Sequence, residues 1–196
     1  MRPVFAKGVG RQATLTQGAA AGTLHLPAGN ADQIFAVGQP LFCSEEDGTE
    51  VEYLGAAAAV DALGVSGMFV LSANKAAGAK VWTPEQVLIW PAERSAPLMR
   101  AYDSGVEVQR AIGGALYHTR LRDPFREETL IFAKVARSVY EAWETWFITA
   151  IGNGREAFTF VDEERAVKTV KVLDSKIEQR EDAPGVAKIS IRLAIL

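Results

Sequence analysis

The residues best suited to chemistry in this sequence are five carboxylates that gather between positions 45 and 52. They are Glu45, Glu46, Asp47, Glu50 and Glu52. Carboxylate oxygens are the ligands that Ca²⁺ takes in proteins, but the spaced Asp/Asn/Gly pattern of a calcium loop is missing here. Asp47-Gly48 between two strand-like runs is instead typical of a hairpin turn. We therefore expect a solvated hairpin tip and assign no metal ligand.

The sequence holds one cysteine, Cys43, and two histidines, His25 and His118. A thiol acts as a nucleophile when a neighbouring base activates it, and no nucleophile motif surrounds Cys43. We expect a buried, inert thiol in a reducing compartment and no catalytic residue. An enzyme, such as a cell-wall hydrolase fragment, would need Cys43 beside one of the histidines, or a cleft that holds two carboxylates.

Gly8-Val9-Gly10, with Ala13 after it, partly matches a dinucleotide-binding loop. No strand pattern precedes these glycines, and no βαβ unit surrounds them, although both are needed to place a pyrophosphate at a helix N-terminus. We therefore expect no cofactor.

The composition is that of an ordinary globular protein. The 196 residues are 48% hydrophobic and 23% charged, which suits one or two domains. The net charge of −3 lacks the basic footprint of a nucleic-acid-binding protein. The apolar runs are too short to span a membrane, and the first residues lack the apolar segment of a signal peptide. We expect neither a membrane nor secretion by the usual route.

An amphipathic helix is predicted over about 137–151. Ser138 and Glu141 match a capping box, and Gly152 and Gly154 can end the helix. Its apolar face recurs at steps of three and four residues. The face consists of Val139, Trp143, Trp146, Phe147 and Ala150. Because its neighbours are acidic, unlike those of a stacking platform for bases, we expect this face to pack on a sheet.

The chain ends on a regular alternation of apolar and polar residues. This pattern predicts a half-buried antiparallel strand over 188–196. Its core face consists of Ile189, Ile191, Leu193 and Ile195. Further strands are predicted over 157–162 and 167–174, with the charged residues 162–165 as the turn between them.

The first 90 residues carry short apolar runs separated by turn signals. Strands are predicted over 23–26, 34–37, 40–43, 50–54, 68–71 and 79–82. The residues 64–67 are interpreted as a turn, and the proline-rich segment 83–97 as a connector. Strands are also expected over 105–112, 116–121 and 129–135. The fold class is thus mainly β, with domains 1–90 and 91–196, the first a small β-barrel or sandwich.

Several pieces of this chain match a known architecture. In the second domain they are Trp90-Pro91, SGVEVQR (104–110), the aromatic helix, GNGREAFTFVD (152–162) and KISIRLAIL (188–196). In the first domain they are ATLTQGAAAGTLHL (13–26), VGQPLF (37–42), GTEVEYL (48–54) and GAKVW (78–82). Residues 90–196 resemble bacteriophage tail-tip and minor tail proteins, including ring-forming distal tail proteins. Residues 1–90 are similar to a small accessory β-module of phage structural proteins.

The resemblance implies a tail-tube-like β-sandwich with one packed helix for residues 91–196. It also implies a structural virion component of the tail tip or baseplate, assembled in the host cytoplasm. Such subunits form rings, often hexameric, and contact other tail proteins such as the tube and the hub. DNA passes through the lumen without specific binding. The resemblance implies no enzymatic activity and no cofactor.

A second interpretation belongs to another class. A small β-sandwich can act as a binding module that recognises a glycan or a protein on a host surface through its loops. Exposed aromatic side chains in a shallow groove would favour this interpretation.

Overall fold

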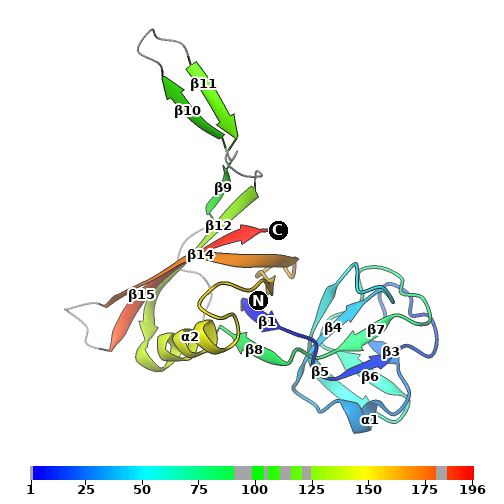
Figure 1. Cartoon of the computed structure of the whole chain (residues 1–196). Coiled ribbons are helices and arrows are strands. Elements are labelled where there is room, and N and C mark those ends of the chain that lie inside the picture. The colour runs from blue at the N-terminus through cyan, green and yellow to red at the C-terminus, as the bar shows by residue number, and fades with distance from the viewer. Residues whose placement is uncertain (1, 91–98, 104–105, 111–115, 121–124, 180–184) are drawn as a thin grey trace. The chain divides into compact units, whose positions relative to one another are not determined.

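The computed structural model describes residues 2–90, 99–103, 106–110, 116–120, 125–179 and 185–196. The chain divides into two compact units (Figure 1). The first contains Met1–Ile89 and Thr159–Val167, and the second contains Trp90–Phe158 and Lys168–Leu196. The described chain is mainly β, with curled antiparallel sheets and two helices, which confirms the fold class at this level. Neither helix in the described ranges is both long and apolar enough to cross a membrane.

Six short antiparallel strands form one curled sheet in the first unit. In their order of pairing they are β2 (Gln12–Thr14), β7 (Lys80–Trp82), β4 (Pro40–Ser44), β5 (Glu52–Asp61), β6 (Gly64–Gly67) and β3 (His25–Pro27). The register of β5 shifts once against β4 and once against β6, and such bulges bend a strand. Just beyond the two end strands, Leu15 bridges Ala28. This bridge nearly closes the sheet on itself, as in a small barrel.

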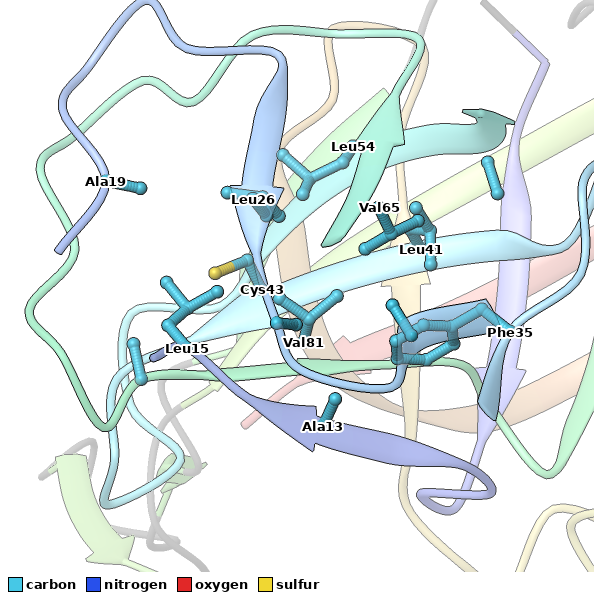
Figure 2. Close-up of a cluster of buried hydrophobic side chains, with 14 of the residues drawn as sticks. Ala13, Leu15, Ala19, Leu26, Phe35, Leu41, Cys43, Leu54, Val65 and Val81 are labelled. Atoms are coloured by element: carbon cyan, nitrogen blue, oxygen red, sulfur yellow. The ribbon is translucent and has the colours of Figure 1, made fainter. Parts of the chain in front are cut away.

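The interior of this curled sheet holds a cluster of small and medium-sized apolar side chains (Figure 2). Its larger members are Leu15, Leu26, Phe35, Leu41, Cys43, Leu54, Val65, Leu71 and Val81. Short strands and many alanines suit a barrel of this size, because little room is left at its axis. The Cys43 thiol lies in this core.

The prediction of a turn over residues 64–67 was wrong, because Gly64–Gly67 is strand β6. A Cβ at Gly64 would lie 2.2 Å from the carbonyl oxygen of Leu26, and one at Gly67 would lie 2.7 Å from that of Leu54. These glycines permit the close approach of neighbouring backbones, a common reason for glycine within a strand.

Two other strand predictions in the first unit were wrong. The residues 34–37 do not form a strand, since Ile34 ends the short helix α1 (Ala31–Ile34), which seats Phe35 in the core. The run 68–71 has no strand either, because β6 ends at Gly67. In each place one apolar side chain, Phe35 or Leu71, is buried in the core without being part of a strand. A short apolar run in the sequence looks the same in both cases.

A second ladder of the first unit contains β1 (Val4–Lys7), which pairs with β8 (Gln86–Ile89) and with β13 (Phe158–Val161). Part of the predicted connector 83–97 is therefore a strand. Its residues 91–97 lie outside the described ranges. Aromatic rings pack beside this ladder, with Phe42 stacked on Trp82 at 4.6 Å and tilted against Tyr53 at 5.1 Å between ring centroids.

The second unit contains a ladder of long strands. Their order is β14 (Val167–Gln179), β15 (Val186–Ile195), β12 (Phe125–Ala136) and β9 (Met99–Asp103). β10 (Val106–Arg110) and β11 (Leu116–Arg120) pair with each other as a separate two-stranded sheet. The helix α2 (Arg137–Thr149) follows β12. β10 and β11 lie within the strands predicted over 105–112 and 116–121, whose residues 105, 111, 112 and 121 are outside the described ranges, and β12 contains the strand predicted over 129–135.

The helix α2 begins at Arg137, where it was predicted to begin, but without the expected cap. Ala136 occupies the N-cap position and has no side chain able to accept a hydrogen bond, so the predicted capping box of Ser138 and Glu141 is wrong. The Glu141 carboxylate instead accepts a 2.7 Å hydrogen bond from Arg137 Nε one turn earlier. After the helix, Gly152 and Gly154 adopt positive φ angles, which ordinary residues rarely do.

Candidate functional site

Three of the five carboxylates between positions 45 and 52 surround a buried lysine, Lys75, in the first unit. Lys75 Nζ lies 3.2 Å from Glu45 Oε1 and 3.4 Å from Glu52 Oε1. It also donates to the backbone carbonyl of Glu50 at 3.0 Å. The Lys75 side chain is 0% exposed. The lysine therefore joins its own loop to the loop between β4 and β5.

Hydrogen bonds from Ser72 complete this cluster. The Ser72 backbone N–H and hydroxyl both donate to Glu52 Oε2 at 2.7 Å. Burial by itself would raise the pKa of Glu52, but the bonds from Ser72 and the charge of Lys75 outweigh it, so the pKa is lowered. Burial would likewise lower the pKa of Lys75, and its carboxylate partners raise it instead. Both groups are therefore charged at neutral pH.

This arrangement gives the acidic run a structural role. The ammonium group takes the position between the carboxylates that a cation would otherwise occupy, and buried charges of this kind are normally paired. Among the described residues, no group of three or more His, Cys, Asp or Glu side chains could hold a metal ion. Asp47 stabilises the hairpin turn to which it belongs, because its carboxylate accepts hydrogen bonds from the backbone N–H and the hydroxyl of Thr49.

The structure does not give Cys43 the surroundings of a nucleophile. The thiol is fully buried in the barrel core, and burial raises its pKa to about 12. His25 lies at the surface of the first unit, with Nδ1 3.3 Å from the Ser66 hydroxyl across the β3–β6 pair. His118 belongs to β11 in the second unit. A thiol with so high a pKa carries almost no thiolate at neutral pH.

The predicted helix face lies against aromatic side chains of the second unit. Trp143, Trp146 and Ala150 are buried, while Val139 and Phe147 are half-buried. The Trp143 ring lies 6.1 Å from that of Trp90, and Trp146 lies 5.1 Å from Phe158. Tyr140, which the sequence reading left off this face, is also buried. The stacked pair of Trp90 and Phe132, with centroids 4.3 Å apart, continues the cluster.

The predicted core face of the closing strand β15 is buried along most of its length. Ile189, Ile191 and Leu193 are fully buried, and Ile195 is half-buried near the end of the strand. Ala187 extends the same face and is buried as well. β15 pairs with β12 on one side and β14 on the other, so the strand is central in its ladder. A central position explains why the alternation is so regular.

Among the described residues, the surface is hollowed at places where another molecule could bind, and two of these hollows are of similar volume. One, of about 390 Å³, lies beside α2 and is lined by Trp143, Glu144, Phe147, Ile148, Asn153 and Ser175. Trp143 offers little surface there, since it is 1% exposed and its Nε1 donates to Ser175 Oγ at 2.9 Å. The other, of about 370 Å³, lies in the first unit and is lined by Val51, Glu52, Tyr53, Ser72 and residues 164–167.

Sequence reasoning missed Lys75, Ser72 and Arg165, the polar residues that give the first unit its specific contacts. Lys75 follows a run of small residues, and Arg165 ends a charged turn, so neither has a local motif. Each is defined by a partner far away in the chain, which is why no spacing rule could find it.

The comparisons with known proteins provide no family. No model of a protein family matches the chain, and no curated protein matches its sequence.

Proposed function

We propose that this chain is a structural subunit of a bacteriophage tail, a ring-forming protein of the distal-tail or tail-tip kind. Under this proposal residues 91–196 are a tail-tube-like β-sandwich, and residues 1–90 are an accessory β-domain. The subunit binds copies of itself, in a ring that we expect to be hexameric, and neighbouring tail proteins such as the tube and the hub. DNA passes through the lumen, and the protein carries out no catalysis.

The observation that carries this proposal is the pair of strands that end the ladders, β8 in the first unit and β9 in the second. Among the described residues, nothing pairs with the outer edge of either strand. Both expose apolar side chains, with Val87 37%, Ile89 45% and Met99 53% exposed. An open edge presents unpaired N–H and C=O groups that a strand of another chain can complete.

The separate β10–β11 sheet also supports an assembly. A sheet of two strands is marginally stable in water when nothing covers it, and this one joins no third strand of the described chain. We therefore expect it to become covered by a neighbouring subunit. Interfaces that repeat head to tail close into a ring when the rotation between subunits allows it.

The net charge of −3 suits a channel that DNA traverses. A ring with a basic lumen would bind the phosphate backbone and slow its passage, whereas a mildly acidic ring does not attract it.

Native mass spectrometry and negative-stain imaging of the purified chain test this proposal. We expect a closed oligomer with a central hole, and antibodies against the chain should label the tail tip of intact virions. A chain that stays monomeric at high concentration and is absent from virions would refute the proposal.

A further inference from the structure

The turn between β13 and β14 is held rigidly by its first residue. One carboxylate oxygen of Asp162 accepts from the backbone N–H groups of Glu164 and Ala166, each at 2.9 Å. The backbone of Asp162 also accepts from Arg165 N–H at 3.1 Å and donates to the Ala166 carbonyl at 3.1 Å. Four hydrogen bonds over five residues leave this turn one conformation.

Arg165 occupies the one position of this turn that favours glycine. Its φ angle is +70°, in the left-handed region that costs energy for a residue with a Cβ. Its guanidinium carbon lies 4.9 Å from the centroid of the Phe69 ring. An exposed cation–π contact is worth no more than the backbone strain, so stability alone does not account for an arginine here. Strain of this kind is often found at binding sites.

Arg165 lies at the hollow of about 370 Å³ described above, which is within the size range of small-ligand sites. In the described part of the chain no carboxylate lies within 4.0 Å of its guanidinium. Its donors are therefore available to a ligand. An acceptor is present as well, in the exposed Glu164 carboxylate. Val51, Val167 and Tyr53 add apolar surface.

We propose that this hollow binds a neutral sugar unit. A sugar carries hydroxyl groups that both donate and accept, so it can use the guanidinium of Arg165 together with the carboxylate of Glu164. Arg165 and Glu164 carry opposite charges, and Glu52 is paired with Lys75, so the lining has no excess charge that would favour an anion or a cation over a neutral ligand. The apolar side chains suit the C–H groups of a sugar ring. This site does not depend on the proposed ring assembly.

The test uses three monosaccharides that share one ring and differ in charge. These are glucose, glucuronate and glucosamine, with galactose and N-acetylglucosamine added to vary the stereochemistry and substituents. Each is titrated at millimolar concentration into the ¹⁵N-labelled full chain, and the backbone amide shifts of Ser72 and residues 164–167 are followed. We expect saturable shifts with at least one neutral sugar, and weaker binding of the two charged ones.

Three variants separate binding from structure. Arg165→Gln keeps the backbone strain and removes the charge, and it should weaken binding about tenfold. Arg165→Gly should weaken binding similarly while the melting temperature stays equal or rises, because the strain is relieved. Arg155→Gly changes another exposed arginine and should leave binding unchanged.

Any of three results would overturn this inference. The first is an absence of amide shifts in the hollow with every neutral sugar, and the second is tighter binding of glucuronate than of glucose. Equal sugar affinity of Arg165→Gln and the parent would show that Arg165 only covers Phe69.

Discussion

At the scale of single residues, Lys75 is the most consequential side chain of the first unit. Its ammonium group is shared by three carboxylates and one carbonyl, and it is fully shielded from water. A buried ion pair is not a strong source of stability when compared with an apolar substitute, but removing one partner leaves an uncompensated buried charge. We therefore expect the cluster to be intolerant of single changes.

We predict that Lys75→Met lowers the free energy of unfolding by about 3 kcal/mol, because Glu52 loses its counter-charge. Urea unfolding at neutral pH measures this difference. Lys171→Met, at an exposed lysine of β14, is the control and should change stability by less than about 0.5 kcal/mol. Equal stability of Lys75→Met and the parent would show that the contacts of Lys75 are not formed in solution.

The same cluster predicts a dependence on pH. The pKa of Glu52 is lower in the folded chain than in the unfolded chain. Its contribution is therefore complete above the unfolded pKa, about 4.3, and is lost as the pH falls through the folded pKa. Thermal melts between neutral and acidic pH should show a steeper acid loss for the parent than for Glu52→Gln. Parallel curves for the two proteins would contradict the ionic role of Glu52.

At the scale of elements, the close approach of β3 to β6 depends on a missing side chain. We predict that Gly64→Ala destabilises the first unit by about 3 kcal/mol, because the new Cβ would overlap the Leu26 carbonyl. Gly29→Ala is the matched control, since the nearest atom to its added Cβ is a methyl carbon at 3.7 Å. Chemical denaturation of both variants measures the difference, and similar midpoints would contradict the β3–β6 geometry.

The helix α2 depends on its aromatic face. We predict that Trp146→Asp abolishes cooperative folding of the second unit, because it places an unpaired charge between Trp143 and Phe158. Ile148→Asp, at a side chain that is 57% exposed, should melt nearly as the parent does. Near-UV circular dichroism reports the packing of the tryptophans. A parent-like spectrum for Trp146→Asp would show that the helix face is misassigned.

Elements with strong internal periodicity were predictable, and elements defined by distant partners were not. The alternation in β15 and the helical spacing of Trp143 and Trp146 are local patterns imposed by one buried face. The strand at Gly64–Gly67 has no such pattern, because its glycines serve the backbone of β3. The cluster at Lys75 and the turn at Arg165 depend on contacts between loops, which a single sequence does not encode as a motif.

At the scale of the whole molecule, open strand edges are the feature that most needs a partner. We predict that Ile89→Lys prevents self-association while the chain stays folded, since a charge on an edge strand opposes pairing with another edge. Leu63→Lys is the control, because Leu63 is 77% exposed at the turn between β5 and β6 and belongs to neither β8 nor β9. Sedimentation velocity measures the oligomers. Oligomers of unchanged size in Ile89→Lys would exclude β8 from the interface.

The buried position of Cys43 has a practical consequence. It is the one cysteine in the chain, and it lies inside the barrel of the first unit. A thiol reagent can modify it only when that barrel opens, so the labelling rate measures the opening of one half of the protein while the other half stays silent. Cys43 thus serves as an internal probe of transient opening of the first unit.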